Sequence, residues 1–396
     1  MVLSDKVRHI SPSPTLSITA KANRMKAEGI NVIGFGAGEP DFDTPVTIKE
    51  AAKKAIDRGF TKYTPTAGTK ELKEAICAKF KKDNGLEYTP DEVLVSCGAK
   101  HSIFNIVVAL CQEGEEVIIP SPYWVSYPEM VKVAGAKAVI LDTGENTNFK
   151  ITPEQLENSI TPRTKLLILN SPSNPTGMVY SRPELEKLSR VIVKAGIYCI
   201  SDEIYEKVMY DEPHVSIASL DSEIKKRTIV VNGVSKAYAM TGWRIGYCAG
   251  PKEIIQAMSN LQDHSTSNPA SIAQAASVEA LTGDQGDVAT MVGEFKKRRD
   301  FMAARVHAIT GLRTLKPQGA FYCWINIARI LNKSVNGRKI SSSLELTDAL
   351  LQDAHVAVVP GGVFGDDNYI RLSYAASTEN ITEGLDRIER FIEELD

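Results

Sequence analysis

The 396-residue sequence lacks the features of a membrane protein or an exported protein. It contains no apolar run of about 18 residues, the length that a membrane-spanning helix requires. Its first residues, Met1 to Arg8, include no apolar stretch of the kind found in a secretory signal. The net charge of −3 leaves no excess of basic residues, which argues against broad binding to nucleic acid or anionic membranes. We therefore expect a cytoplasmic protein that binds neither.

Cysteine is also scarce. The six cysteines are widely spaced, and even the nearest pair, Cys97 and Cys111, stands 14 residues apart. This spacing does not match a zinc site, and we expect no bound metal. Most of the cysteines stand in apolar segments and are expected to be buried free thiols, which favours a reducing compartment.

Several catalytic signatures are missing. There is no Walker A sequence, no Gly-x-Ser-x-Gly elbow and no His-Glu-x-x-His motif. Residues 36–41 contain two glycines in the spacing of a dinucleotide-binding fingerprint, but the third glycine is lacking and no helix pattern follows directly. These absences argue against an NAD-dependent dehydrogenase.

The composition that remains is that of an ordinary globular protein, with 43% hydrophobic and 24% charged residues. A chain of this length is expected to form roughly two domains. In its first part, short apolar runs alternate with helix-length segments, which predicts an α/β fold with a mainly parallel sheet and helices on both faces. The predicted strands are 92–96, 116–120, 138–141, 165–170, 198–201 and 228–231, and the main predicted helices are 46–58, 68–84, 99–111, 127–134 and 183–195.

The pattern changes beyond about residue 260, where long helical segments are followed by a few strands. This change predicts a second, smaller α+β domain, which the N-terminal residues are expected to join. We expect residues 1–45 to form the N-terminal arm and part of the small domain, 46–285 the large domain and 286–396 the rest of the small domain. The supporting segments are helices at 16–28, 271–282, 287–310 and from 382, strands near 32–35, 319–325, 356–359 and 369–374, and a polar surface loop at 332–343.

Lys236 stands shortly after the predicted strand at 228–231, in a segment that also contains Arg244. A lysine at a strand end can have its pKa lowered by burial and by nearby cations, so that its amine can attack a carbonyl and form a Schiff base. An isolated lysine after a turn is more commonly an ordinary surface residue. The reactive interpretation therefore depends on which residues stand at the neighbouring strand ends.

Polar residues at the carboxyl ends of strands are candidates because ligands of an open α/β sheet bind there. Asp202 follows one predicted strand, and Asn174 lies in the turn after another. Gly98, Ala99 and Lys100 open a helix, where free N–H groups can hold a phosphate. Simpler alternatives exist, because an aspartate can cap a helix and an asparagine can serve as an ordinary turn residue.

Taken together, these residues suit pyridoxal phosphate. This cofactor requires a phosphate site at a helix start, an arginine such as Arg244 for a bidentate phosphate contact, an aspartate at a strand end and a Schiff-base lysine. Asp202 would keep the pyridine nitrogen protonated. Lys236 would hold the aldehyde and later move protons.

The order of these segments resembles the fold-type I pyridoxal-phosphate aminotransferases of class I/II, and within them the aspartate aminotransferase group in its bacterial form. The resemblance covers nearly the whole chain and implies a large cofactor-binding domain and a smaller domain. Its motifs are Ala37 to Phe42, Lys62 to Thr64, Ser121 to Tyr127, Asn174 to Gly177, Ser201 to Tyr205, Val231 to Tyr247 and Ile370 to Ala375.

The resemblance implies a role for each candidate around the cofactor ring. Lys236 corresponds to the Schiff-base lysine and Asp202 to the partner of the pyridine nitrogen. Asn174 and Tyr205 correspond to donors to the 3′-oxygen of the ring, which tune the pKa of the imine. Trp124 corresponds to the aromatic residue that stacks on the ring.

The resemblance also implies the phosphate contacts and the assembly. Tyr63 is similar to a tyrosine that reaches the phosphate of the neighbouring subunit, which implies a homodimer with shared active sites. The phosphate contacts within the chain are implied to be Gly98, Ala99, Lys100 and Arg244.

Arg371 is implied to bind the α-carboxylate of the substrate, in a site that Gly38, Trp124 and Asn174 also line. A planar guanidinium suits a carboxylate that must keep one orientation while its Cα–H bond breaks. The alternative for Arg371 is a surface ion pair after a strand.

The distal substrate group is implied to meet Lys100, with help from hydroxyls near the N-terminus and from residues 265–267. A lysine there favours the dicarboxylates, so the implied reaction moves the amino group of aspartate to 2-oxoglutarate in a ping-pong cycle. Aromatic amino acids, alanine and prephenate remain alternative substrates. Some relatives that use prephenate have a lysine where this chain has Ser11, which puts that activity in doubt.

Two other functions are known on the same fold. A β-lyase would keep the cofactor residues without needing a distal cation, so Lys100 argues against it. A regulator that senses pyridoxal phosphate would need a DNA-binding module, and the sequence begins directly with the aminotransferase pattern and is not basic.

Overall fold

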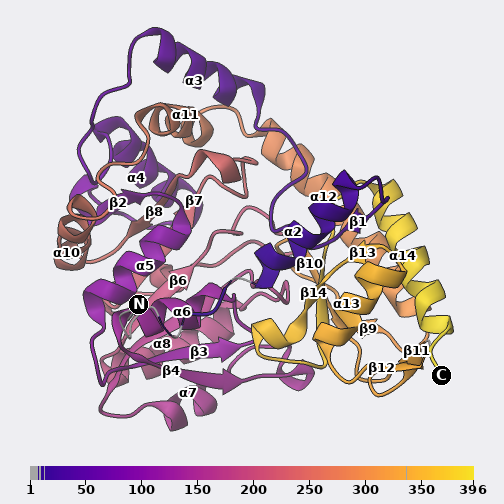
Figure 1. Ribbon diagram of the computed structural model, residues 1–396. Helices are drawn as coiled ribbons and strands as arrows, with labels where there is room; N and C mark the ends of the chain where they lie inside the picture. The colour runs from indigo at the N-terminus through magenta and orange to yellow at the C-terminus, as the bar shows by residue number, and fades with distance from the viewer. Residues whose placement is uncertain (1–7, 9, 13, 336) are drawn as a thin grey trace.

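The computed structural model describes residue 8 and residues 10–12, 14–335 and 337–396. Its elements form two groups side by side, one around a seven-stranded sheet and one around a four-stranded sheet, with the long helix α12 (Gly286–Ala308) running between them (Figure 1). None of the helices in the described ranges has the length and apolar character needed to cross a membrane.

The seven-stranded sheet confirms the predicted mainly parallel arrangement. Its order is β2-β8-β7-β6-β5-β3-β4, and β8, alone among the described strands of this sheet, runs in the direction opposite to all the others. The sequence pattern does not predict β8, a four-residue strand that begins at the end of the segment with Lys236 and Arg244. The strands are β2 (Val93–Ser96), β3 (Glu116–Ser121), β4 (Lys137–Asp142), β5 (Thr164–Asn170), β6 (Tyr198–Asp202), β7 (Thr228–Gly233) and β8 (Gly246–Ala249).

Helices cover both faces of this sheet, which explains why its central strands are apolar without alternation. Leu166 and Ile168 of β5 face α5 (Ala99–Leu110), α6 (Ser126–Ala134) and α10 (Lys252–Asp263). Leu167 and Leu169 face the opposite layer. That layer contains α3 (Val46–Asp57), α4 (Lys70–Asn84), α7 (Pro153–Ser159), α8 (Arg182–Ala195), α9 (Ser222–Lys225) and α11 (Ser271–Thr282).

The second group is an antiparallel sheet with the order β14-β15-β10-β9, packed against helices. An N-terminal strand joins this group, because β1 (Ile33–Gly34) pairs in parallel with β13 (Val356–Ala357). The division at residues 45 and 285 stays a prediction. The other elements of the group are α2 (Pro14–Ala27), β9 (Arg313–Thr314), β10 (Tyr322–Asn326), α13 (Ser343–Asp353), β14 (Val359–Pro360), β15 (Tyr369–Ser373) and α14 (Thr378–Glu393).

The polar segment 332–343 is more ordered than the expected surface loop. It contains the short antiparallel pair β11 (Ser334–Val335) and β12 (Arg338–Lys339). Gly337, with φ of 74°, lies in the turn between the two strands, and Val335 and Ile340 are buried below it. Two apolar side chains are therefore enough to attach an otherwise polar segment to the core.

A buried ion pair links α4 to the segment after β6. The ammonium group of Lys79 contacts the carboxylate of Glu206, and the two side chains are only 4% and 5% exposed. Asn84 donates to the other carboxylate oxygen at 2.8 Å. Burial by itself would raise the pKa of Glu206, but Lys79 and His214 outweigh it and lower that pKa to about 2.

Replacing Lys79 with methionine is expected to lower the free energy of unfolding at pH 7 by about 3–5 kcal/mol, because Glu206 would remain as an unpaired buried charge. Denaturant unfolding measures the change. The exposed pair of Lys53 and Glu50 provides the control, since Lys53→Met should change stability by less than about 1 kcal/mol.

The contribution of Glu206 to stability depends on pH in a defined direction. Because the pKa of Glu206 is lowered from 4.5 to about 2 in the folded protein, its contribution is present above pH 4.5 and is lost as the pH falls towards 2. Stability at pH 7 that is equal in Lys79→Met and the native protein would contradict this account.

Candidate active site

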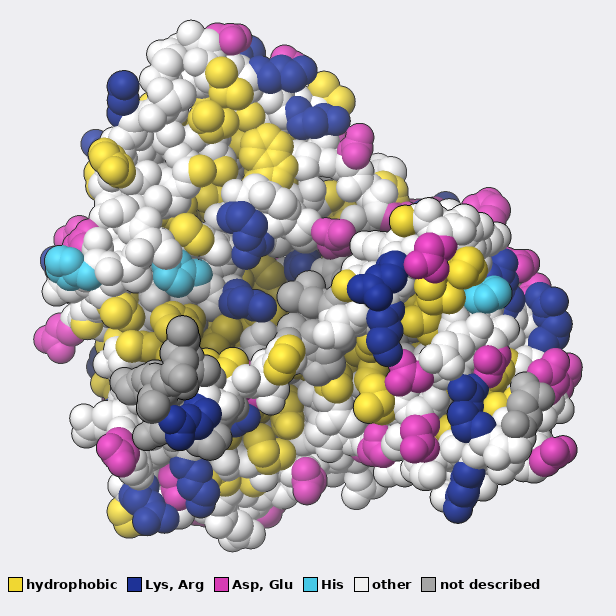
Figure 2. Space-filling model, in the orientation of Figure 1, with side chains coloured by type: hydrophobic (Ala, Val, Ile, Leu, Met, Phe, Trp, Pro, Cys, Tyr) yellow, Lys and Arg dark blue, Asp and Glu magenta, His cyan; other side chains and the backbone are white. Residues whose placement is uncertain are grey.

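A cavity of about 380 Å³ lies at the carboxyl ends of the parallel strands, between the two groups of elements. Its wall combines the start of α5, the ends of β5 and β6, the loop after β7, residues 36–39 and β15. Figure 2 shows this face hollowed between the two parts, with lysine and arginine side chains around the hollow. The cavity is therefore positioned for an anionic ligand.

Ten of the twelve predicted site residues line this one cavity. The exceptions are Gly98, which is directly next to it in sequence, and Tyr63, whose side chain points to solvent with 92% exposure. Residues 265–267 also lie outside its lining, in the turn after α10. The ten are Gly38, Ala99, Lys100, Trp124, Asn174, Asp202, Tyr205, Lys236, Arg244 and Arg371.

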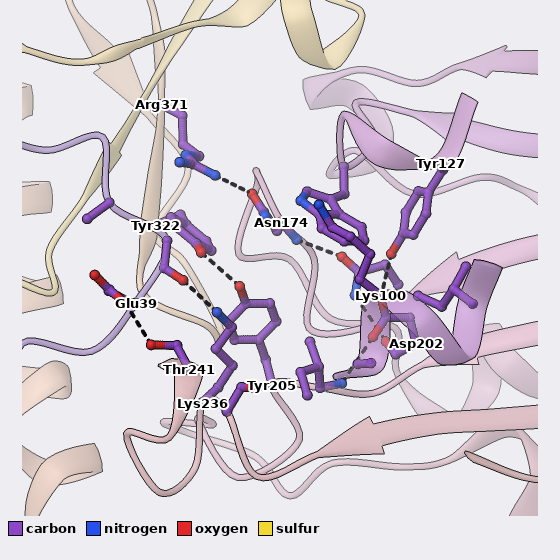
Figure 3. Close-up of a pocket in the computed structure, with 18 of the residues that line it drawn as sticks. Glu39, Lys100, Tyr127, Asn174, Asp202, Tyr205, Lys236, Thr241, Tyr322 and Arg371 are labelled. Atoms are coloured by element: carbon purple, nitrogen blue, oxygen red, sulfur yellow. Dashed lines mark hydrogen bonds between the residues drawn. The ribbon is translucent and has the colours of Figure 1, made fainter. Parts of the chain in front are cut away.

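Lys236 projects from the loop after β7 towards the N-terminal segment, where its Nζ donates to the carbonyl oxygen of Gly38 at 2.6 Å (Figure 3). Burial lowers the pKa of Lys236 to about 8, with Arg244 and Arg371 acting in the same direction and Glu39 and Asp202 opposing them. A substantial fraction of this amine is therefore neutral near pH 8, as a nucleophile or a base must be.

Asp202 ends β6 and is nearly completely buried. Its Oδ2 accepts a hydrogen bond from Tyr127 Oη at 2.7 Å, and its Oδ1 accepts one from the backbone N–H of Ile204 at 3.2 Å. Burial raises its pKa to about 6 despite these two donors. The alternative that Asp202 caps a helix is wrong, because a turn follows it. None of the described lysines and arginines forms an ion pair with the oxygens of Asp202, and such a buried carboxylate suits a protonated nitrogen on a ligand.

The start of α5 and Arg244 form the basic side of the cavity. Ala99 and Lys100 begin the helix, so their N–H groups have no intrahelical acceptor. Gly98 has φ of 90°, and a Cβ there would lie 2.4 Å from Arg244 Nη2, so the glycine lets the guanidinium approach the helix start. Helix N–H groups beside an arginine form a site for a phosphate.

Arg371 defines the opposite side of the cavity. It stands on β15 with 3% exposure, and it donates to Asn174 Oδ1 at 2.8 Å and to the carbonyl oxygen of Gly36 at 2.9 Å. Its Nε has no hydrogen-bond partner, and no acidic residue of the described chain forms an ion pair with it. The alternative of a surface ion pair is therefore wrong. A buried arginine without an anion is suited to receive a carboxylate.

Lys100 completes the polar lining. Its Nζ lies 4.8 Å from the centre of the Trp124 ring, a cation–π contact. Burial lowers its pKa, and the neighbouring Arg244 lowers it further. Lys100 and Arg371 thus present two cations to one cavity.

Four further residues of the lining carry no role that the sequence pattern predicts. Tyr127 binds Asp202, and Asn170 donates to the carbonyl oxygen of Asp202 and accepts from the backbone N–H of Asn174. Glu39 accepts from Thr241, and Tyr322 contacts Tyr205. Tyr127 and Glu39 stand inside the family motifs, whereas Tyr322 belongs to an apolar strand that carries no local signal.

The residues present fit pyridoxal phosphate. The buried carboxylate of Asp202 faces the cavity and has no ion-pair partner in the described part of the chain, Lys236 has a lowered pKa, and free helix N–H groups stand beside Arg244. These three features match the pyridine nitrogen, the aldehyde and the phosphate of that cofactor.

The comparisons with known proteins point to one family. The family model "Aminotransferase class I and II" matches residues 30–388. An aspartate/prephenate aminotransferase from Nitrosomonas europaea is 51% identical over 393 residues, which cover 98% of this chain and 99% of the relative. An aspartate aminotransferase from Geobacillus stearothermophilus is 51% identical over 394 residues, which cover 99% of both chains.

Solved structures agree with these relatives. The aspartate aminotransferase of Rhizobium meliloti superposes with a TM-score of 0.96 at 45% identity, over the whole of both chains. The aspartate aminotransferase of Thermus thermophilus with maleate has a TM-score of 0.93 at 43% identity, covering 98% of this chain and 99% of that one.

Proposed function

This chain belongs to the class I and II aminotransferase family, and on that premise we propose that it transfers the amino group of aspartate to 2-oxoglutarate in a ping-pong cycle that depends on pyridoxal phosphate. The observation that carries the proposal is the pair of cations, Arg371 and Lys100, that faces one cavity. A dicarboxylate can satisfy both, whereas alanine or an aromatic amino acid leaves one cation without a partner.

Pyridoxal phosphate, when bound, supplies an aldehyde and a ring that accepts electrons from the substrate. Lys236 Nζ, with a pKa near 8, is the group of this chain that can take and return the proton at the substrate Cα. Asp202 holds a proton on the pyridine nitrogen. Arg371 and Asn174, already joined by a hydrogen bond, orient the α-carboxylate beside Gly38.

The remaining cofactor contacts are part of the same proposal. Asn174 and Tyr205 would donate to the 3′-oxygen, and the Trp124 ring would stack on the pyridine ring. The free N–H groups at the start of α5 and the guanidinium of Arg244 hold the phosphate. Together these residues would hold the cofactor in one position before substrate binds.

A homodimer is also proposed. Tyr63 is 92% exposed and makes no contact with the cavity of its own chain, and the large apolar side chains of Val46, Ile56 and Phe60 are exposed as well. Burying them against a second copy would let Tyr63 reach the partner's phosphate site. Sedimentation of the cofactor-loaded protein is expected to give a particle of two chains, and a single-chain particle at micromolar concentration would contradict the proposal.

A stopped-flow half-reaction tests the function directly. The cofactor-loaded protein is mixed in turn with aspartate, glutamate, alanine and phenylalanine, and conversion of the aldehyde form to the amine form is followed by absorbance. Prephenate is then offered as the acceptor to the amine form, because the Nitrosomonas europaea relative is named for it. Aspartate and glutamate are expected to react fastest. A fast reaction restricted to alanine or phenylalanine would contradict a dicarboxylate enzyme.

Lys100 is expected to determine the preference for dicarboxylates. One charge-assisted hydrogen bond contributes about 1.5–3 kcal/mol in a partly desolvated site. Lys100→Ala should therefore lower kcat/KM for aspartate by roughly ten- to a hundredfold and change kcat/KM for alanine little. Lys132→Ala, on the outer face of α6, is the control and should affect neither substrate. Equal losses for both substrates would mean that Lys100 supports only the phosphate.

A further inference from the structure

Tyr322 holds the guanidinium of Arg371 from the neighbouring strand. Strands β10 and β15 pair antiparallel with Trp324 opposite Arg371 and Tyr322 opposite Ser373, so Tyr322 and Arg371 are diagonal neighbours on one face. The Cζ of Arg371 lies 4.4 Å from the centre of the Tyr322 ring. Two hydrogen bonds, this ring contact and a second one to Phe364, whose ring centre lies 5.0 Å from the same Cζ, therefore set the direction of the arginine.

The hydroxyl group of Tyr322 faces a second functional residue. Its Oη lies 2.8 Å from Tyr205 Oη, and both side chains are buried (Figure 3). A Cβ at Gly38 would lie 3.2 Å from the same oxygen, so the glycine leaves room for the hydroxyl pair. Tyr322 belongs to the four-stranded sheet and Tyr205 to the segment after β6, so the contact joins the two parts of the molecule.

We propose that Tyr322 is a positioning residue with two roles. It makes Tyr205 a stronger hydrogen-bond donor, and it keeps the guanidinium of Arg371 directed at the substrate carboxylate. The inference rests on the proposed function. A phenol has one proton to donate. If Tyr205 gives its hydrogen bond to the 3′-oxygen of the cofactor, the 2.8 Å contact requires Tyr322 to donate to Tyr205. Hydrogen bonds in such a chain strengthen one another.

The first readout is the pKa of the bound cofactor, measured from its visible absorbance against pH. Donation to the 3′-oxygen favours negative charge there and so favours the deprotonated form. Tyr322→Phe removes only the hydroxyl and is expected to raise this pKa by roughly 0.1–0.7 unit. Tyr205→Phe removes the whole bond and is expected to raise it by about 1–2 units.

The double variant decides whether Tyr322 acts through Tyr205. Adding Tyr322→Phe to Tyr205→Phe should cause no further shift of the absorbance pKa. Tyr374→Phe, which removes an equally buried hydroxyl outside the cavity, is the control and should leave that pKa unchanged. An unchanged pKa in Tyr322→Phe, or a shift that persists in the double variant, would overturn the inference.

The second readout is the affinity for maleate, a dicarboxylate that does not react. Tyr322→Phe keeps the ring and should bind maleate as the native protein does. Tyr322→Leu loses the ring contact and is expected to weaken maleate binding by roughly two- to thirtyfold. Arg371→Lys is expected to bind maleate more weakly than Tyr322→Leu. A folded Tyr322→Leu variant that binds maleate as tightly as the native protein would overturn the proposed role of Tyr322 in positioning Arg371. If neither Tyr205→Phe nor Arg371→Lys changes its readout, the proposed function itself fails.

Discussion

Replacing Lys236 with alanine is expected to lower kcat for transamination by about 10⁴-fold, the upper range for loss of a group that transfers protons in the transition state. The variant should still fold and still bind pyridoxal phosphate, because the start of α5, Arg244 and Asp202 remain in place. The variant lacks the amine of Lys236. In the described chain, no other amine projects from the loop after β7 into the cavity.

Covalent retention of the cofactor separates this role from a structural one. After borohydride treatment and denaturation, the native protein should keep the cofactor and Lys236→Ala should release it. Lys236→Arg is the matched variant, since it keeps a cation that cannot become neutral near pH 8. It should be as inactive as the alanine variant. Turnover close to native in either variant would refute a chemical role for Lys236.

Removing the charge of Asp202 is expected to lower kcat by roughly 10²–10³-fold, the range seen when one electrostatic partner of a transition state is lost. Without the carboxylate, the pyridine nitrogen is not kept protonated and the ring accepts electrons poorly. Asp202→Asn is the sharper variant because it keeps the shape and can still accept the hydrogen bond from the N–H of Ile204. Steady-state kinetics of Asp202→Asn beside Asp202→Ala measures the effect of the charge.

Stability measurements complete this test. Burial raises the pKa of Asp202 to about 6, above its ordinary value of 3.8, so ionising it at pH 7 costs folding free energy. Without cofactor, Asp202→Asn should therefore be at least as stable as the native protein at pH 7. Asp202→Asn that turns over at the native rate would mean that Asp202 only shapes the turn after β6.

The fold is largely predictable because the apolar pattern of most segments matches the way those segments are buried in the folded protein. Strands such as β5 and β6 are buried on both faces, so their apolar runs stand out in the sequence. The antiparallel strand β8 escapes prediction for the opposite reason. It is only four residues long and begins at the end of a motif rich in glycine and aromatic residues, where no period distinguishes a strand.

The candidate site is predictable wherever the sheet itself gathers the residues. Strands β5, β6 and β7 are neighbours, with Asn170 opposite Asp202 and Asp202 opposite Val231. Residues that follow their carboxyl ends must therefore meet at one edge. This geometry explains why the sequence pattern alone is enough to group Asp202 with Lys236.

The sequence by itself predicted a candidate site at strand ends, namely a lysine, an aspartate and a helix start, together with the family to which the chain belongs. Only the tertiary structure decided how those groups are tuned. The hydrogen bond from Tyr127 to Asp202 and the pairing of Tyr205 with Tyr322 join residues 75 and 117 positions apart. The lowered pKa of Lys236 comes mainly from burial, which depends on segments packed from both parts of the molecule. Local periodicity carries information about which face of an element is buried, but not about which distant side chain it will meet.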